Sequence, residues 1–448
     1  MAKKEKDPRR EYRRRRRIRN QLLAWLVLIV LLAGLGAGAY YATDYLMKHP
    51  KKTTAEPVSS DNADTEPTPE ESISGGTIGT PENVDELLEE PEPTEAEPET
   101  DPAVMSLIED MTVEQKVDAL FIVSPEAITN VDRATRAGDA TKSGLEQYAV
   151  GGVLYSAGNI DNGDQFKEMV SATKEIYKEI YNRKLLTFVY EDCGNMTLAG
   201  KINGLEGLPA ASELAAGSET DVKTAYAAVG AYLKGYDIDG DLAPLAAVLT
   251  DENGYLKDRA FSSDAATAAV MTGAAVEGLN GGGVISCLNA FPGEGSLSTD
   301  PEKGAASTDR SLDDMRSSEF LPFSAGIEAG ADMVMVSNMS AQNAAGNGDS
   351  CIMSEKLIKE VLREELGFKG VIVTAPLEQA GMSESGKTGN AVLRSFRAGA
   401  DMFIIRSHDD LNAARQVLTD AVADGTISEE ALDEALIRIY TMRLNKSL

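Results

Sequence analysis

The sequence is poor in the residues that build metal sites and disulfide frameworks. Its 448 residues include three cysteines and two histidines, and Cys193, Cys287 and Cys351 lie far apart. Three scattered cysteines are too few for a disulfide framework or a structural zinc site, so we interpret them as buried thiols. His408 is the only histidine beyond residue 49. The sequence therefore predicts no metal and no cofactor.

Positive charge is also scarce outside the N-terminus. The formal net charge is −29, and about −23 of it falls from residue 103 onward. A surface of this sign repels DNA, RNA and other anionic polymers, so we expect no nucleic-acid partner. The glycine run 281–283 lacks the Lys-Ser/Thr of a phosphate loop, which argues against nucleotide binding at that place.

The N-terminus is organised like a membrane anchor. Residues 1–19 carry eleven basic and three acidic side chains, and residues 22–42 carry no charge at all. Twenty-one residues of helix cross a hydrocarbon core of ~30 Å. Basic flanks stay inside, so we expect a cytoplasmic tail at 1–21, a transmembrane helix at 22–42 and an extracytoplasmic remainder. The alternative is a cleaved signal peptide, since Ala37-Gly38-Ala39 resembles a cleavage site, but signal cores usually span only ~7–15 residues.

Residues 43–102 are expected to form a disordered acidic linker. Between residues 53 and 102 there are sixteen acidic side chains, eight prolines and no lysine or arginine. Such a segment cannot bury enough apolar surface to offset the entropy of ordering it. Its fifty residues span roughly 40 Å as a flexible tether. The folded remainder, 103–448, would then stand away from the cell membrane.

Short apolar runs recur through residues 103–448, mostly separated by helical patterns. The runs lie at residues 119–123, 152–155, 185–190, 242–248, 284–288, 333–336, 371–374 and 402–405. Continuous apolar runs fit strands buried on both faces, as in a parallel sheet covered by helices. Eight such runs predict an α/β fold of the (β/α)₈ TIM-barrel type, with a doubly wound sheet as the alternative. In such barrels the chemistry lies on loops that follow the carboxyl ends of the strands.

Several segments together resemble the N-terminal barrel of glycoside hydrolase family 3, especially its bacterial β-N-acetylhexosaminidase branch. They include Met-Thr-Val-Glu-Gln-Lys-Val at 111–117, Asp-Arg-Ala-Phe-Ser-Ser-Asp at 258–264, Gly-Ala-Asp-Met-Val-Met-Val-Ser at 330–337 and Leu-Arg-Glu-Glu-Leu-Gly-Phe-Lys-Gly at 362–370. The resemblance covers residue 103 to the C-terminus. It implies a (β/α)₈ barrel that acts on or binds glycans containing N-acetylglucosamine, such as cell-wall material.

The chain departs from the family at the loop that carries the acid/base. The family's Lys-His-Phe-Pro-Gly-His-Gly-Asp-Thr loop corresponds to Asn-Ala-Phe-Pro-Gly-Glu-Gly-Ser-Leu at 289–297. The resemblance therefore places Asn289 where the family has a sugar-binding lysine. It places Glu294 where the family has the histidine that serves as general acid/base. Glu294 could still donate a proton, which is worth about 10²–10⁴-fold in rate.

The remaining site positions are also changed. The family's nucleophile is an aspartate of a Val-Thr-Asp-Ala-Leu segment, and Val-Thr-Ala-Pro-Leu at 373–377 places Ala375 there. A histidine after the sixth strand becomes Asn338. Glu191 and Asp192 fall where the family has an acidic and arginine-bearing sugar-binding segment. Arg259 alone keeps the family's sugar-contacting residue type.

Two hypotheses follow, one without and one with catalysis. A retaining glycosidase needs a nucleophile, and an alanine at 375 cannot form the glycosyl-enzyme intermediate. We therefore expect a membrane-anchored pseudoenzyme that binds glycans or serves as a scaffold for surface proteins. The alternative is an active β-N-acetylhexosaminidase with Glu294 as acid/base, in which Glu191 or Asp192 orients the substrate's own N-acetyl group. Each of these side chains also has a plain structural interpretation, Glu191 and Asp192 as partners for loop amides and Arg259 as half of an ion pair.

Overall fold

The structure is a computed structural model that describes residues 100–448, apart from 195, 197, 199–200, 203–206, 251–253 and 379–387. The predicted basic tail, the predicted transmembrane helix and nearly all of the predicted linker lie outside these residues. Among the helices that the structure does describe, none is long and apolar enough to cross a membrane. The described residues all belong to one unit, Pro93–Leu448.

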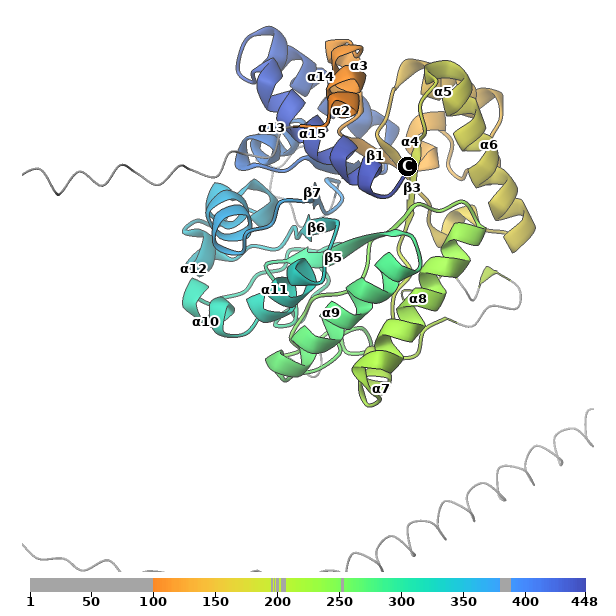
Figure 1. Cartoon of the computed structure of the whole chain (residues 1–448). Helices are drawn as coiled ribbons and strands as arrows, with labels where there is room; N and C mark the ends of the chain where they lie inside the picture. The colour runs from red at the N-terminus through yellow and green to blue at the C-terminus, as the bar shows by residue number, and fades with distance from the viewer. Residues whose placement is uncertain are drawn as a thin grey trace, which may run out of the picture. The chain divides into compact units, whose positions relative to one another are not determined.

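Eight parallel strands close into a barrel in chain order, and β8 pairs back with β1. Figure 1 shows the strands at the centre with the helices around them. The strands are β1 (Phe121–Val123), β2 (Gly152–Leu154), β3 (Leu186–Val189), β4 (Gly240–Asp241), β5 (Ile285–Phe291), β6 (Met333–Val336), β7 (Val371–Thr374) and β8 (Met402–Ile405). The predicted (β/α)₈ barrel is confirmed, and the doubly wound alternative is wrong.

The strands form where the chain is apolar throughout, because both of their faces are covered. Every residue of β6 and β8 is buried. The closing pair β1–β8 aligns Ile122 with Ile404 and Val123 with Ile405. Successive residues of a strand point to opposite faces, so the barrel interior and the layer beneath the helices both receive branched side chains. Burial on two faces removes the polar alternation that an exposed sheet would show.

The helices alternate with the strands and cover the barrel (Figure 1). Those before β5 are α2 (Pro102–Glu109), α3 (Val113–Asp118), α4 (Pro125–Thr129), α5 (Asp139–Gln147), η1 (Ala157–Asn159), α6 (Gly163–Tyr181), α7 (Ala211–Ala215), α8 (Glu219–Gly235) and α9 (Ala265–Gly281). Those after it are α10 (Leu312–Ser317), α11 (Phe320–Glu328), α12 (Gln342–Ala345), η3 (Cys351–Met353), η4 (Lys356–Glu365), α13 (Thr388–Ala398), α14 (His408–Ala423) and α15 (Glu429–Asn445). Helix η4 has π-helical hydrogen bonding.

Helix α3 begins at a reciprocal hydrogen-bonding motif between Thr112 and Gln115. The Thr112 hydroxyl accepts a hydrogen bond from the backbone N–H of Gln115, and the Gln115 side chain accepts one from the backbone N–H of Thr112. This reciprocal capping box satisfies two donors that the first turn of a helix leaves without partners. The motif fixes the point at which the chain enters the barrel.

The prediction for the fourth strand is wrong in its position. The apolar run 242–248 does not form the strand; β4 is Gly240–Asp241, immediately before it. Pro244 has no N–H for a strand ladder. Gly240 is needed because a side chain there would meet the Phe188 ring, which lies 2.5 Å from the Cβ position. A glycine followed by an aspartate carries no apolar signal, so the pattern pointed a few residues too far along the chain.

Candidate active site

A cavity of about 740 Å³ lies at the carboxyl ends of the strands. Small-molecule sites commonly measure about 300–1,000 Å³. Its wall draws on residues within or just beyond seven of the eight strands, namely Ser124, Tyr155, Tyr190, Asn289, Met335, Ala375 and Arg406. The barrel mouth is therefore where the sequence placed the site, and Tyr190 and Met196 line this cavity without filling it.

Glu294 lies in the cavity wall on the loop after β5, and it is buried with 8% of its surface exposed. The Tyr255 hydroxyl donates a hydrogen bond to Oε2, and the Ser337 hydroxyl donates one to Oε1. Burial raises the pKa of Glu294, while the two hydroxyls and the charge of Arg259 oppose that rise. A positioned carboxyl with a raised pKa is what a general acid requires.

The glycines on either side explain how a carboxylate reaches this position. Gly293 has a φ of 121°, a backbone conformation that L side chains rarely adopt. A Cβ on Gly295 would lie 1.8 Å from the backbone oxygen of Val248. The Pro-Gly-Glu-Gly sequence therefore permits a close turn against a neighbouring loop, and that turn presents Glu294 to the cavity.

Arg259 is a largely buried cation of the cavity wall, and its one ion pair in the described part of the chain is weak. Its side chain is 11% exposed, and the nearest carboxylate atom, Oδ2 of Asp192, is 4.0 Å from Nη2. Its Nε is buried without a hydrogen-bond partner among the residues that the structure describes. Such donors are rare in folded proteins unless a ligand or water satisfies them. The expected pairing of Arg259 with a nearby carboxylate is thus present only at the limit of contact.

Glu191 and Asp192 follow β3 as predicted, but neither lines the cavity. Glu191 is fully buried, and its Oε2 accepts a hydrogen bond of 2.5 Å from the backbone N–H of Leu198. Asp192 accepts hydrogen bonds from the backbone N–H of Leu245 at 3.0 Å and from the Tyr226 hydroxyl at 2.5 Å. Both carboxylates thus accept hydrogen bonds from backbone N–H groups of loops, and Asp192 also accepts one from a side chain of α8.

The other predicted residues divide between the cavity and the layer behind it. Asn289 and Ala375 line the cavity, and the Asn289 side chain donates to the backbone oxygen of Leu242 at 3.3 Å. Asn338 lies outside the lining and donates to the backbone oxygen of Pro376 at 2.7 Å. The structure therefore brings Glu294, Arg259, Asn289 and Ala375 to one cavity and leaves Glu191, Asp192 and Asn338 outside it.

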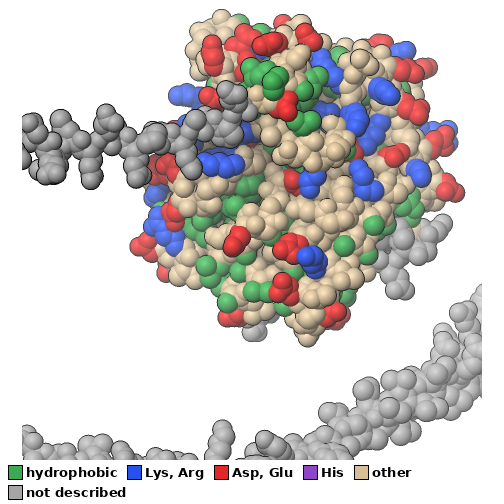
Figure 2. Space-filling view, viewed as in Figure 1, with side chains coloured by type: hydrophobic (Ala, Val, Ile, Leu, Met, Phe, Trp, Pro, Cys, Tyr) green, Lys and Arg blue, Asp and Glu red, His purple; other side chains and the backbone are tan. Residues whose placement is uncertain are grey.

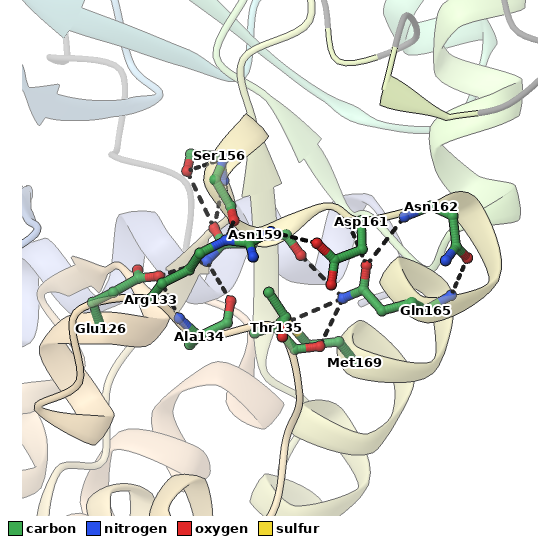
Figure 3. Close-up of polar contacts among 11 residues, drawn as sticks. Glu126, Arg133, Ala134, Thr135, Ser156, Asn159, Asp161, Asn162, Gln165 and Met169 are labelled. Carbon is green, nitrogen blue, oxygen red and sulfur yellow. Dashed lines mark hydrogen bonds and ion pairs between the residues drawn. The ribbon is translucent and has the colours of Figure 1, made fainter.

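Glu126 is a cavity carboxylate that our reading of the sequence missed. It is the third residue after β1, in a Ser-Pro-Glu segment, and the predicted residue Glu191 is the second after β3. Its Oε1 accepts hydrogen bonds from the backbone N–H of Ala134 at 2.9 Å and from the Asn159 side chain at 2.7 Å. Figure 3 shows these residues within a polar network that joins the loops after β1 and β2. This network fixes Glu126 and Ser156, both of which face the cavity.

Two ion pairs also line the cavity and were not predicted. Asp300 pairs with Lys303 at 2.9 Å, and Glu302 pairs with Arg406 at 3.2 Å. Asp300, Glu302 and Lys303 belong to a loop that carries no motif, and Arg406 directly follows β8. No sequence pattern therefore connects them. Together with Tyr155 and Tyr190, they give the cavity charged groups beside aromatic rings.

Metal ligation has no support in the part of the chain that the structure describes. No group of three or more His, Cys, Asp or Glu side chains there is arranged to hold a metal ion. His408 begins α14, where its Nδ1 lies 2.8 Å from the backbone oxygen of Ala127, outside the cavity. Cys193, Cys287 and Cys351 are buried and free, as predicted.

Proteins of similar sequence include several that are named as beta-hexosaminidases. Beta-hexosaminidase A of Pseudoalteromonas piscicida is 25% identical over 325 residues, which are 67% of this chain and 54% of that protein. A Beta-hexosaminidase of Xanthomonas oryzae pv. oryzae (strain MAFF 311018) is 34% identical over 161 residues, 36% of this chain and 47% of that protein. The chain spans about half the length of these two relatives.

Solved structures share the fold at low identity. A glycoside hydrolase family 3 beta-N-acetylglucosaminidase from Paenibacillus sp. str. FPU-7 superposes with a TM-score of 0.69 at 24% identity, covering 75% of this chain and 63% of that chain. The Beta-N-acetylhexosaminidase from Beutenbergia cavernae DSM 12333 gives 0.67 at 23% identity, covering 76% and 99%. The family description "Glycosyl hydrolase family 3 N terminal domain" matches residues 112–442. The chain belongs to glycoside hydrolase family 3, whose N-terminal barrel domain its described residues form.

Proposed function

We propose that this protein is a membrane-anchored, extracytoplasmic member of the family that binds glycans containing N-acetylglucosamine and has lost the ordinary catalytic set. Arg259 carries the proposal. It offers a buried Nε without a partner among the described residues, in the wall of a cavity of suitable size. Sugar hydroxyl and acetamido oxygens would accept hydrogen bonds from that guanidinium.

The loss of catalysis rests on Ala375. The resemblance places the family's nucleophile at this position, and its methyl group offers no lone pair to an anomeric carbon. Glu378, three residues further along, accepts hydrogen bonds from the backbone N–H groups of Arg406 and Ser407 and lies outside the cavity lining. In this structure it ties the loops after β7 and β8 together.

The remaining wall suits a sugar ring. Tyr155, Tyr190, Met196 and Met335 present aromatic and thioether groups, and Asn289 adds an amide. Ligand sites commonly combine an apolar lining with a few polar groups that fix orientation. Such a wall would hold the C–H faces of a pyranose while Arg259 and Glu294 bind its polar edge.

Titration of the full-length protein with the trimer of N-acetylglucosamine tests this proposal. We expect saturable binding that Arg259→Ala weakens roughly tenfold or more, since a hydrogen bond to a charged group contributes about 1.5–3 kcal/mol. Arg316→Ala is the matched control, because that side chain is 43% exposed, pairs with Asp313 and lies outside the cavity lining. Equal affinity in both variants, or no binding by a folded sample, would count against the proposal.

A second candidate is an active β-N-acetylhexosaminidase, and Glu294 favours it. This carboxyl faces the cavity, is held by two hydroxyls and has a raised pKa, as an acid/base requires. The similar proteins also carry the name of that activity. Under this hypothesis Glu294→Gln abolishes turnover of an aryl N-acetyl-β-glucosaminide while the melting temperature stays nearly unchanged. Turnover that survives the substitution would eliminate it.

The anchor is a separate part of the proposal and rests on the sequence of residues 22–42. We expect the full-length protein to remain with membranes after carbonate extraction, and a variant lacking 22–42 to become soluble. Protease added outside intact cells should cut the linker and release the barrel. Recovery of the full-length protein in the soluble fraction would contradict the anchor.

Surface proteins are the other class of partner. Crosslinking in cells would show whether they bind the barrel.

A further inference from the structure

A second cavity, of about 620 Å³, lies between η4, the end of α13 and the start of α15. Gly399 and Ala400 line it immediately before β8, and Arg363 of its wall donates to the backbone oxygen of Gly370, immediately before β7. The cavity is therefore at the amino ends of the strands, opposite the mouth. Among the residues that the structure describes, none lines both this cavity and the mouth cavity.

This second cavity is rich in positive charge on an acidic domain. Five basic side chains line it, namely Lys359, Arg363, Arg394, Arg397 and Arg438. The carboxylates that line it are Glu355 and Glu434, and those that pair with its arginines are Asp349 and Asp401. Among the described residues, five positive charges thus meet four negative ones, although residues from 103 onward carry about −23 in total. Lys359 pairs with Glu355, so Arg397 is the basic side chain of this wall that is left without an ion pair in the part that the structure describes.

The arginines of this cavity also have unused hydrogen-bonding capacity. The buried Asp401 is shared by two of them, Arg363 through Nη2 at 2.6 Å and Arg438 through Nε at 2.8 Å. Arg397 is an exposed side chain of the wall, and it forms no ion pair and no hydrogen bond with any residue in the described ranges. A guanidinium has five N–H donors and no acceptor, so Arg397 can offer its donors to the acceptor oxygens of a ligand.

We propose that this cavity binds a small phosphorylated compound, of the class of phosphate monoesters and pyrophosphates. Guanidinium forks match phosphate oxygens in pairs and bind them through charge-assisted hydrogen bonds. Thr426 and Ser428 bring hydroxyl groups to the same wall. A neutral sugar would leave the positive charge unmatched.

The ligand is a small compound because the positive charge is local. On the face seen in Figure 2, Lys and Arg side chains are interspersed with Asp and Glu, and no field of one sign extends across it. A long anionic polymer would leave the cavity and meet an acidic surface that repels it. A compound with one or two phosphate groups would fit inside the cavity and avoid that repulsion.

Calorimetric titration of the full-length protein with inorganic pyrophosphate tests the proposal, with glycerol 3-phosphate as a monoester. We expect saturable binding that Arg397→Ala weakens by about tenfold and Arg397→Glu abolishes. Arg397 has no partner among the described residues, so these variants should keep the wild-type melting temperature. Arg316→Ala is the matched control, because Arg316 pairs with Glu365 and lies outside the cavity lining.

Competition shows which cavity is occupied. An excess of the N-acetylglucosamine trimer should leave the pyrophosphate affinity unchanged, because the two cavities lie at opposite ends of the barrel. Displacement by the trimer would assign the phosphate to the mouth and overturn the proposal. Absence of saturable binding at millimolar pyrophosphate, or equal affinity in wild type and Arg397→Glu, would overturn it as well.

Discussion

The hydroxyl of Tyr255 donates a hydrogen bond to the carboxylate of Glu294 in the wall of the barrel mouth. Ser337, which follows β6, donates to the other oxygen of the same carboxylate. Two segments distant in sequence therefore fix one carboxyl group in the wall of the cavity that Ala375 also lines. Under our proposal, the site keeps a positioned carboxyl while Ala375 occupies the position of the family's nucleophile.

Glu294 should make stability depend on pH in a defined direction. Because burial raises its pKa above the ordinary value of 4.5, the folded protein holds this proton more tightly than the unfolded chain does. The resulting stabilisation is complete below the unfolded pKa and is lost as the pH rises through the folded pKa. Glu294→Gln cannot ionise. The wild-type free energy of unfolding should therefore fall relative to that of Glu294→Gln as the pH rises from acid toward neutral.

Urea unfolding of both proteins across that pH range measures the difference. Glu277→Gln is the control, since Glu277 is 44% exposed on α9 and pairs only at the surface with Lys223. Its difference from wild type should not follow the pattern set by Glu294. If the free-energy difference between wild type and Glu294→Gln stayed constant with pH, the raised pKa would be wrong.

Restoring a carboxylate at residue 375 should restore chemistry. Ala375→Asp places a nucleophile in the cavity that already holds Glu294, so hydrolysis of an aryl N-acetyl-β-glucosaminide should exceed that of wild type by about tenfold or more. Ala375→Asn has nearly the same shape without a nucleophilic oxygen, and it should remain at the wild-type level. Equal rates for the aspartate and asparagine variants would show that residue 375 is not beside the reacting carbon.

The turn that presents Glu294 should tolerate no side chain at Gly295. A Cβ there would lie 1.8 Å from the Val248 oxygen, so Gly295→Ala must displace the loop and should destabilise the protein by about 1–3 kcal/mol. Gly348→Ala is the control, because no atom lies within 4 Å of its Cβ position. The control should change stability by less than about 0.5 kcal/mol. Thermal unfolding that ranks the two variants equally would contradict the close approach.

Asp401, at the amino ends of the strands, should contribute strongly to the free energy of unfolding. It is fully buried, pairs with Arg363 and Arg438, and accepts a hydrogen bond from the backbone N–H of Ile372. Asp401→Ala leaves a mostly buried guanidinium without its counter-charge and should cost about 3–5 kcal/mol. Glu277→Ala breaks an exposed pair and should leave the unfolding midpoint unchanged. A small effect of Asp401→Ala in urea unfolding would show that solvent reaches the pair.

The barrel could be predicted because its strands differ in composition from everything around them. Runs such as Val371–Thr374 and Met402–Ile405 are apolar without interruption, and the structure makes them β7 and β8. The position of the fourth strand was not predicted, because its two residues serve distant partners. Gly240 leaves room for the Phe188 ring, and Asp241 accepts a hydrogen bond from the backbone N–H of Glu191. Neither requirement is visible in local sequence, since both partners lie about fifty residues away.

Only those site residues whose position depends on the end of a strand could be predicted from the sequence. Glu294, Asn289 and Ala375 reach the cavity because they lie within or just after β5 and β7. Glu191 follows a strand in the same way, yet its oxygen contacts the backbone N–H of Leu198, because the direction of a side chain depends on the path of its own loop. The contact of Tyr255 with Glu294 spans 39 residues and has no local signature.

One measurement tests most directly whether this barrel binds glycans without cleaving them or is an enzyme. The full-length protein is incubated with the trimer of N-acetylglucosamine and followed by NMR, which reports both binding and new reducing ends. We predict saturable binding, with cleavage no faster than in a parallel sample of Glu294→Gln. Cleavage by wild type that disappears in Glu294→Gln would contradict the loss of catalysis and would make Glu294 the acid of a working hydrolase.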